Sequence, residues 1–596
     1  MYKKYQVIII GAGHAGCEAA LACSRMGVNT LLITLNMDSI ARMSCNPAIG
    51  GIAKGQIVRE IDALGGEMGL ITDKAGLQFK LLNSSRGPAV WSPRAQCDRL
   101  LYSILMNKSI QNQRNLEILQ SEVKSLIIKN NKVYGIKLLT GETVSTNIVV
   151  VTTGTFLKGE IYLGKKHFDG GRFNEKSALY LSKSLTDDCG LILNRFKTTT
   201  TPRINSLSIN YSKILKQYGD EKPIPFSHFT KINNWRKSLK QLPCWLTYTN
   251  NITCEIVKNN LELSSIYLGK VNSKSPRYCP SIEEKIERYP DKISHHIFLE
   301  PEGYNTNEVY LNGLYTGLPF EVQQKLINSI KGLENAKVLR YGYAIEYDYS
   351  DPLQITNILE TKTIRNLFLG GQINGTTGYE EAAAQGLMAG INAGLRALDK
   401  ESLVLSRDKA YIGVLIDDLT TKGVDEPYRM FTARAEYRLA IRNDNADLRL
   451  MDIGYSIGLI KDKMYQKFKI YKDLVNKICN NKIGFDKSIN YNDLSPWSID
   501  KIKLESHIHN IYKGYIKIQN KFINKIKKSE NKIIPKDFDY NKVCSFSNET
   551  KQRLSNLRPK TIGQASRIIS IKPSDIAILN IYIEKFNALK NKKRVL

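Results

Sequence analysis

The chain of 596 residues lacks paired cysteines, clustered metal ligands and long apolar runs. Its ten cysteines are scattered, and no two of them form a CxxC pair. This argues against a disulfide framework, a zinc site and a dithiol reductase, so we expect no metal and a reducing compartment. No run of 18 apolar residues exists, and the N-terminal MYKKYQVIII has no signal-cleavage region. We therefore expect a cytoplasmic protein with no membrane span.

Proline is also scarce, with 18 residues, and no internal repeat is evident. In contrast, 41 glycines and an apolar fraction of 42% are typical of globular domains. A chain of this length is expected to form three or four of them.

Acidic residues are in deficit, and the formal net charge is +29. Residues 501–596 hold 22 Lys and Arg against 7 Asp and Glu, so about half of the excess lies there. A basic surface attracts polyanions, and nucleic acid is the first candidate. The enrichment in Lys, Asn and Ile along the chain is also what a drift of the coding sequence towards A and T produces, so both explanations stay open.

The N-terminus has the pattern of a dinucleotide-binding βαβ unit. Residues 6–10 (QVIII) predict a buried parallel strand, residues 17–27 a helix and residues 29–34 a second strand. The glycine-rich GAGHAG of residues 11–16 lies between the first strand and the helix. This context makes the GxGxxG pattern considerably more specific than the pattern alone.

Each glycine of this loop has an expected purpose. Gly11 would make the tight turn, Gly13 would let a pyrophosphate approach the backbone, and Gly16 would allow close packing of helix against strand. The acid that commonly binds ribose at the end of the second strand is missing, because residues 34–36 are Thr, Leu and Asn. Ribose recognition must therefore differ from the simplest pattern.

Two further landmarks lie far from this loop. Residues 132–154 predict a meander that returns to the sheet and ends in TTGT, and residues 367–394 predict a strand, a glycine-rich turn and an alanine-rich helix. Together the three segments indicate one flavoprotein dinucleotide fold of the glutathione-reductase type, with residues 200–345 inserted. The alternative is an ordinary α/β domain whose glycines only serve tight turns.

In these and other stretches, the chain resembles a known family, the glucose-inhibited division protein A family. This is the large flavoprotein subunit of the bacterial tRNA uridine 5-carboxymethylaminomethyl modification enzyme. The matching stretches include GAGHAGCEAA, RMSCNPAIGG, GPAVWSPRAQCDR, PRYCPSIEEK, GGQINGTTGYEEAAAQG and EPYRMFTARAEYRL, and they extend from end to end. A shorter relative, a folate-dependent flavoprotein that methylates a uridine in the T loop of tRNA, lacks the long helical C-terminal half.

The resemblance implies an activity together with its cofactors and partners. It implies FAD, NADH and 5,10-methylenetetrahydrofolate as one-carbon donor, and a GTPase partner in a complex of two copies of each protein, with a homodimer of this chain. The expected reaction builds a carboxymethylaminomethyl or aminomethyl group on C5 of the wobble uridine, position 34, of certain tRNAs. Two alternatives stay open: tRNA uridine C5 methylation, or a catalytically degraded, flavin-containing tRNA-binding protein.

The implied fold class is α/β. A glutathione-reductase-type, FAD-binding Rossmann-like domain would carry an inserted α/β domain and an all-helical C-terminal region. The predicted divisions are a discontinuous FAD domain (1–199 and 346–400), an inserted NADH-binding or substrate domain (200–345), a helical domain (401–545) and a basic helical domain for tRNA and the partner (546–596).

Two cysteines are the candidate catalytic residues. A thiolate that adds to C6 of uridine makes C5 nucleophilic, so the reaction requires a cysteine near the flavin. Cys45 follows the glycine loop, and we expect Pro47 to open a helical turn whose N-terminus lowers the thiol pKa. Cys279 lies beside a proline with Arg277 nearby. Which of the two attacks uridine stays open.

The cofactor residues follow from the resemblance. For FAD they are Gly11, Ala12, Gly13, His14, Ala15, Gly16, Val123, Gly154, Gly371, Gln372, Asn374, Gly375, Thr376 and Gly378. For NADH they are Ser275, Pro276, Arg277, Tyr278, Pro280 and Ser281. The sequence departs from the family pattern at residues 273–275, where Ser-Lys-Ser replaces flanking glycines, and at residues 196–204. Both departures weaken the nicotinamide assignment and suggest reduced activity.

The expected RNA contacts are basic residues in two groups. Arg429, Arg434 and Arg438 are interleaved with aromatic residues, and Arg434 and Arg438 are expected to share a helix face. An intramolecular ion-pair network with Glu426 and Glu436 is an equal alternative. The basic tail contributes Lys551, Arg553, Arg558, Lys560 and Arg567 as better phosphate candidates.

Overall fold

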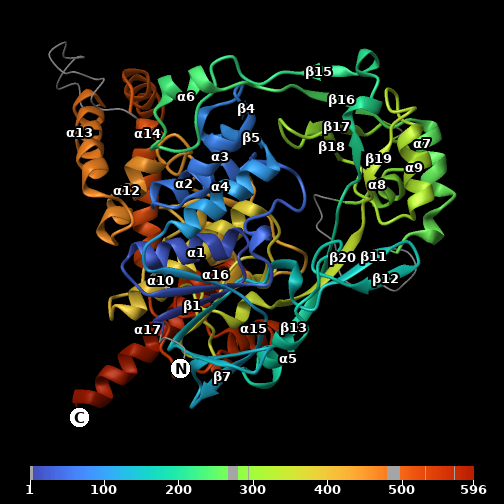
Figure 1. The fold of residues 1–596 in the computed structure, drawn as a ribbon. Helices are drawn as coiled ribbons and strands as arrows, with labels where there is room; N and C mark the ends of the chain where they lie inside the picture. The colour runs from blue at the N-terminus through green and yellow to red at the C-terminus, as the bar shows by residue number, and fades with distance from the viewer. Residues whose placement is uncertain are drawn as a thin grey trace.

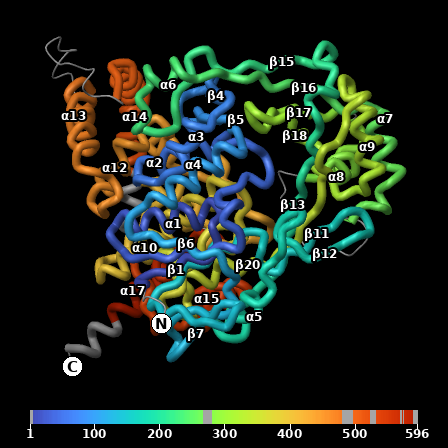
Figure 2. The backbone as a smooth tube through the Cα atoms, viewed as in Figure 1, coloured from blue at the N-terminus to red at the C-terminus, as the bar shows by residue number. Residues whose placement is uncertain are grey.

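The computed structural model describes residues 5–265, 280–292, 294–479, 497–530, 532–568 and 571–595. Figures 1 and 2 show a mixed α/β body, an inserted lobe around β15 to β19 and a helical C-terminal region. In the described parts of the chain, no helix has both the length and the apolar character needed to cross a bilayer.

A five-stranded parallel sheet forms the centre of the main body. Its strand order is β21-β10-β1-β2-β6, and all neighbours pair in parallel. The bounds are β1 Val7–Ile10, β2 Thr30–Thr34, β6 Leu116–Gln120, β10 Ile148–Val151 and β21 Leu367–Leu369. β1 and β10 are buried along their whole length, as expected for apolar strands covered on both faces. The predicted βαβ start and the meander's return to this sheet are confirmed.

Two helices that are far apart in the sequence pack against each other beside this sheet. α1 (His14–Arg25) follows the glycine loop, and α10 (Tyr379–Ala397) follows the third glycine-rich turn. Their contact is unusually close, because Gly386 faces the backbone of Ala15 and Gly390 faces that of Ala19. The glycine- and alanine-rich sequences of both helices permit this approach.

The described residues also form four antiparallel sheets. They are β3-β5-β4 (Ala48–Gly50, Ser92–Cys97, Gly76–Leu82); β7-β8-β9 (Val123–Lys129, Lys132–Leu138, Thr143–Ser145); β12-β11-β20-β13 (Lys166–Asp169, Glu160–Leu163, Ala344–Ser350, Leu193–Thr199); and β15-β16-β17-β18-β14-β19 (Leu215–Gln217, Cys244–Tyr248, His296–Pro301, Glu308–Asn312, Arg203–Asn205, Val338–Arg340).

The six-stranded sheet has its own hydrophobic core with α7 (Asn251–Lys258), α8 (Ile282–Arg288) and α9 (Phe320–Asn328). It forms the lobe at the right of Figure 1. Phe226 and Trp235 lie between its strands in sequence, yet they pack into the main core. The insertion is therefore anchored on the main body by a segment from its own middle.

The remaining helices lie on the main body and in the C-terminal region. They are α2 Lys54–Ala63, α3 Met68–Ala75, α4 Arg99–Gln111, α5 Tyr180–Asp187, α6 Ile232–Ser238, α11 Tyr411–Lys422, α12 Ala446–Ser456, α13 Asp462–Cys479, α14 Ile499–Glu530, α15 Asn548–Leu557, α16 Ile562–Ser566 and α17 Pro573–Val595. A separate small core joins α15, α16 and α17.

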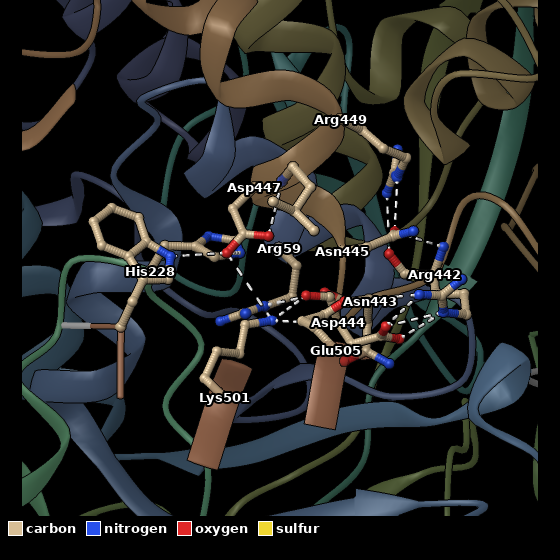
Figure 3. Close-up of polar contacts among 12 residues, drawn as sticks. Arg59, His228, Arg442, Asn443, Asp444, Asn445, Asp447, Arg449, Lys501 and Glu505 are labelled. Carbon is tan, nitrogen blue, oxygen red and sulfur yellow. Dashed lines mark hydrogen bonds and ion pairs between the residues drawn. The ribbon is translucent and has the colours of Figure 1, made fainter. Parts of the chain in front are cut away.

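A buried polar cluster joins the C-terminal helices to the main body (Figure 3). Lys501 and Glu505 of α14 form an ion pair at 2.8 Å, and Arg442 reaches Glu505 at 3.7 Å and Asp444 at 2.8 Å. Arg59 of α2 donates to the carbonyl of Asn443 at 3.3 Å. We call these residues, with His228 and Asp447, the junction cluster. They come from segments far apart in sequence, so the cluster fixes how those segments meet.

The junction cluster predicts an unusual pH dependence for Glu505→Gln. Burial, reinforced by Asp444 and Asp447, raises the pKa of Glu505 to about 7 from an ordinary 4.5. A raised carboxyl pKa stabilises the folded state below the unfolded pKa, and this stability is lost as pH rises through about 7. Glu505→Gln should therefore gain melting temperature relative to wild type between about pH 5 and about pH 8, by a few degrees.

Thermal melts of both proteins across that pH range test this expectation. Glu549→Gln is the matched control, because Glu549 is an exposed glutamate of α15 that pairs with Arg553 on the same helix. The control reports what the loss of one glutamate charge alone does to the melting temperature. A difference between Glu505→Gln and wild type that does not change with pH would contradict the assignment.

Candidate functional site

The carboxyl ends of three parallel strands open into one cavity of about 410 Å³. Gly11 follows β1, Gly154 follows β10, and Gln372 follows β21, and all three residues line this cavity. Parallel strands end at the same edge of their sheet, which explains why segments so distant in sequence meet there. The volume lies in the range of small-molecule and cofactor sites.

The glycine loop leaves open the space that a phosphate group needs. Gly13 caps α1 without any side-chain hydrogen bond, and a Cβ added at Gly13 would meet nothing within 4 Å. A Cβ at Gly16 would instead lie 1.7 Å from the carbonyl oxygen of Gly11. The first N–H groups of α1 therefore face the cavity, and the third glycine serves packing. This fits the pyrophosphate of a dinucleotide.

The cavity wall also contains polar atoms that lack a partner. Nε2 of His14 and Oγ1 of Thr153 are buried without a hydrogen bond among the described residues. Burial, together with Arg172, lowers the pKa of His14 to about 3, so its ring is neutral. Such unmatched groups are costly unless a ligand satisfies them. They are a second observation that fits a bound FAD.

The ribose-binding acid expected at the end of β2 is missing, but another carboxyl lies nearby. Residues 34–36 line the cavity, and so does Glu122, which follows β6. Partial burial raises the pKa of the Glu122 carboxyl, although Lys176 opposes the shift. A carboxyl from the neighbouring parallel strand is thus available in the wall for a ribose hydroxyl.

A lysine between two glutamates lines another part of the wall. Nζ of Lys54 lies 2.8 Å from Glu380 and 3.3 Å from Glu381, at the start of α10. Burial alone would lower the pKa of Lys54, but the two carboxylates more than offset it and raise that pKa. Lys54 is therefore cationic. Glu380 also accepts the N–H of Gly50 at 2.6 Å, which holds the 45–50 loop on this helix.

Cys45 lines the same cavity and is partly exposed. Its backbone N–H donates to the hydroxyl of Tyr379 at 2.6 Å, and its Sγ lies 3.2 Å from the hydroxyl of Tyr310. The prediction that Pro47 opens a helical turn is wrong. Pro47 leads into β3, because residues 48–50 pair with β5. A helix N-terminus at Pro47 therefore does not act on this thiol.

Some of the other predicted FAD residues line the cavity, and the rest lie behind its wall. Ala12, Ala15, Val123 and Gly378 line the cavity, whereas Gly371, Asn374, Gly375 and Thr376 do not. Asn374 is buried and donates to the carbonyl of Leu369 and to Gln385, each at 2.9 Å. The amide side chain of Asn374 therefore stabilises the turn after β21 from the side away from the cavity.

The predicted NADH segment and the second cysteine are only partly described. Ser275, Pro276, Arg277, Tyr278 and Cys279 lie outside the described residues. Ser281 is buried and caps α8 in a reciprocal capping box with Glu284, and Pro280 precedes it. The Ser281 side chain thus has a structural partner at the helix start.

The arginines of residues 429–438 do not form one RNA-facing helix. Arg434 lies in a short 3-10 turn, Thr432–Arg434, and residues 436–440 are turns, so the predicted shared helix face is wrong. The guanidinium of Arg434 stacks 4.2 Å from the Tyr428 ring and faces Asp418 at 3.8 Å. The ring and the carboxylate hold the arginine inward. Arg438 is exposed and lies in the turn that follows.

Two other residues of this segment, Arg429 and Glu436, have different partners. Arg429 lines the cavity and donates to Thr377 at 3.0 Å. Glu436, expected as a partner of these arginines, pairs with Arg407 at 2.7 Å instead. The ion-pair network at this place has Arg407 at its centre, since Arg407 also pairs with Asp417 and Asp418.

The basic tail is partly engaged within the chain. Arg567 pairs with Asp417 of α11 at 2.8 Å, Arg553 pairs with Glu549 at 3.0 Å, and Arg558 donates to the carbonyl of Phe538 at 3.0 Å. Lys551 and Lys560 have no side-chain partner within the described ranges.

The remaining cysteines are packing residues, with one exception. Cys17, Cys23, Cys97, Cys189, Cys244, Cys254 and Cys479 are buried, and Cys544 is exposed. Burial raises the pKa of Cys97 and of Cys244, so both thiols stay protonated. Within the described ranges, no group of His, Cys, Asp and Glu has the arrangement of a metal site.

The sequence analysis missed several groups that surround the thiol and the cavity. Tyr379 lies within a family-like stretch, so its motif was a usable signal, whereas Lys54 lies just beyond the stretch RMSCNPAIGG. Arg203 and Tyr310 come from neighbouring strands of the inserted sheet, in register with each other. Nothing in their local sequence marks them, because only the tertiary packing brings that sheet to Cys45.

Comparison with known proteins gives matches over the whole chain. A family profile described as "Glucose inhibited division protein A" matches residues 6–401, and one described as "tRNA modifying enzyme MnmG/GidA C-terminal helical bundle" matches residues 522–595. The tRNA uridine 5-carboxymethylaminomethyl modification enzyme MnmG of Endomicrobium trichonymphae is 71% identical over 594 residues, covering 100% of this chain and 99% of that protein. The protein of the same name from Thermodesulfovibrio yellowstonii is 47% identical and covers 99% and 100%.

The solved structures agree with these matches. Aquifex aeolicus GidA, in its form I crystal, superposes with a TM-score of 0.89 at 47% identity, covering 98% of this chain and 100% of that one. Its form II crystal gives a TM-score of 0.88 at 46% identity, covering 97% and 98%. The predicted α/β fold with a helical C-terminal region is confirmed.

Proposed function

Because the chain belongs to the glucose inhibited division protein A family, we propose that it modifies C5 of the wobble uridine of certain tRNAs. The added group would be carboxymethylaminomethyl or aminomethyl at position 34. The proposal includes FAD, NADH and 5,10-methylenetetrahydrofolate, and a GTPase partner with two copies of each protein. The observation that carries it is the cavity where three glycine turns meet beside Cys45.

The residues of the cavity suit the cofactor. Gly11 to Ala15 would hold the pyrophosphate at the start of α1, and Glu122 and Val123, which also line the cavity, would hold the ribose. Gln372, Lys54 and Arg429 would face the ring system. Bound FAD would supply the redox equivalents of the reaction, with NADH as reductant. The chain's own contribution is to orient the ring, exclude water and present a thiol.

The thiol would make the poor carbon nucleophile reactive. Addition of the Cys45 thiolate to C6 moves the electrons of the C5–C6 double bond to O4, and C5 then attacks the one-carbon electrophile. Loss of the C5 proton and expulsion of the sulfur restore the double bond. Cys279 is the other candidate for this step, and the assignment between the two cysteines is part of the test below.

The tRNA would lie on the basic C-terminal region. We place the main phosphate contacts on Lys551 and Lys560, whereas Arg553, Arg558 and Arg567 would stabilise the fold that presents them. Lysine contacts to phosphate make binding fall with rising salt. Removal of both lysines should weaken tRNA binding without changing the product made from bound tRNA.

Nucleoside mass spectrometry tests the function directly. We expect purified protein, its GTPase partner, GTP, NADH, the folate donor and tRNA to yield an aminomethyl-type adduct at uridine 34, with glycine and ammonium supplied in separate arms. A tRNA with cytidine at position 34 is the control. A methyl adduct would favour C5 methylation. Unaltered uridine from a yellow, tRNA-binding protein would favour the degraded form.

A further inference from the structure

The inserted sheet places a buried phenol against the candidate thiol. Tyr310 lies in β18, is fully buried, and brings its hydroxyl to 3.2 Å from Sγ of Cys45. Tyr310 is not part of the cavity wall, whereas Cys45 is. The hydroxyl therefore contacts the sulfur from outside the cavity wall, whereas Cys45 itself lines the cavity.

A buried arginine holds both partners in place. Arg203 of β14 is opposite Tyr310 in the sheet, and its guanidinium lies 4.9 Å from the centre of the Tyr310 ring. Nη2 of Arg203 donates to the carbonyls of Ser44 at 3.0 Å and of Cys45 at 3.4 Å. Its Nε pairs with the buried Glu302 at 3.1 Å. The clamp thus fixes the loop and brings a permanent positive charge to it.

The direction of the hydrogen bond follows from the acidities. Burial raises the pKa of Tyr310 well above its ordinary value, and the Cys45 charge raises it further, so the phenol keeps its proton. When the thiol is neutral, either group can donate. When the thiol is ionised, only the phenol can, and an O–H donor then stabilises the sulfur anion.

Other ionisable groups face the same thiol. They include Tyr343 and Tyr379, whose pKa values are raised by burial and also respond to the charge of Cys45. The Tyr379 hydroxyl accepts the Cys45 backbone N–H at 2.6 Å and so holds the loop. Tyr310 therefore acts on the sulfur from the inserted sheet, through the contact of its hydroxyl with Sγ of Cys45.

We propose that Tyr310 is a positioning residue that, clamped by Arg203, stabilises the Cys45 thiolate from the inserted sheet. The thiol proton goes to solvent, and the phenol hydrogen-bonds to the remaining anion without transferring its own proton. The role in uridine chemistry rests on the proposed function. The ionisation of the thiol does not, so the two can fail separately.

The test is the pH dependence of Cys45 alkylation, resolved by peptide mass spectrometry with isotope-coded iodoacetamide. Wild type should react with a midpoint clearly below the ordinary thiol value of about 8.5. In Tyr310→Phe we expect the midpoint to rise by roughly one pH unit, with alkylation near neutral pH falling about tenfold. The plateau rate at high pH should match wild type, because access to the sulfur is unchanged.

Tyr162→Phe is the matched control. It also removes a buried tyrosine hydroxyl, but that hydroxyl donates to Glu160 at 2.7 Å. Its Cys45 midpoint should equal that of wild type. An ordinary midpoint in wild type, or the same midpoint in Tyr310→Phe as in wild type, would overturn the proposal. A lower plateau with an unmoved midpoint would also overturn it, since that pattern reports access. None of these outcomes depends on tRNA turnover.

Discussion

Cys45→Ser is expected to abolish tRNA modification, with a loss of at least about 10³-fold, while the protein keeps its fold and its flavin. A serine hydroxyl is a far weaker nucleophile at neutral pH than a thiolate. The groups that position the loop would survive, because Tyr379 and Arg203 bond the backbone N–H and the carbonyl of residue 45 rather than its sulfur. The variant therefore separates chemistry from structure.

Nucleoside mass spectrometry and flavin absorbance together measure this outcome. Cys544→Ser is the control, since Cys544 is exposed and belongs to the C-terminal region. It should show wild-type activity. Cys279→Ser belongs in the same experiment, because the two cysteines are the competing candidates. Wild-type product from both Cys45→Ser and Cys279→Ser would eliminate the thiol mechanism.

The frame of the site was predictable because it depends on local patterns. Glycines between a buried strand and a helix have a restricted set of uses, so the sequence alone predicts the roles of residues 11–16 and of the turn after residue 369. These turns meet in space because each follows a strand of one parallel sheet, and parallel strands end at the same edge of their sheet. The meander that ends at Gly154 was predicted from pattern as well, and the resemblance to the family added the catalytic role of the cysteine.

The surroundings of the thiol were not predictable in the same way. The sequence suggested that a helix after Pro47 would activate Cys45, and the structure has a strand there. Activation instead comes, in our proposal, from Tyr310 and Arg203, more than 150 residues away along the chain. A strand residue carries no local sign of what it meets across a domain contact. The same limit applies to Arg434, which Tyr428 and Asp418 hold inward.

Gly386→Ala is expected to destabilise the protein by about 3 kcal/mol or more. An added Cβ would lie 2.0 Å from the carbonyl oxygen of Ala15 and 2.4 Å from its Cα, both of them backbone atoms that no rotamer change can move. α1 and α10 would have to separate. Alanine favours a helix over glycine by about 1 kcal/mol, so the clash must exceed this gain for the prediction to hold.

Gly514→Ala provides the opposite case within the same chain. Gly514 also lies inside a helix, α14, but a Cβ added there would meet nothing within 4 Å. We expect it to stabilise the protein by about 0.5 to 1 kcal/mol through helix propensity alone. Thermal or denaturant unfolding of the two variants should therefore give shifts of opposite sign.

Flavin retention extends the comparison from stability to the site. The α1 residue that Gly386 meets, Ala15, also lines the cavity, one residue after the start of the helix whose N–H groups would hold the pyrophosphate. Separating the helices should tilt that N-terminus, so Gly386→Ala should release FAD more readily than wild type, and Gly514→Ala should not. Equal retention and equal stability in the two variants would mean that the close contact of α1 with α10 does not define the cofactor cradle.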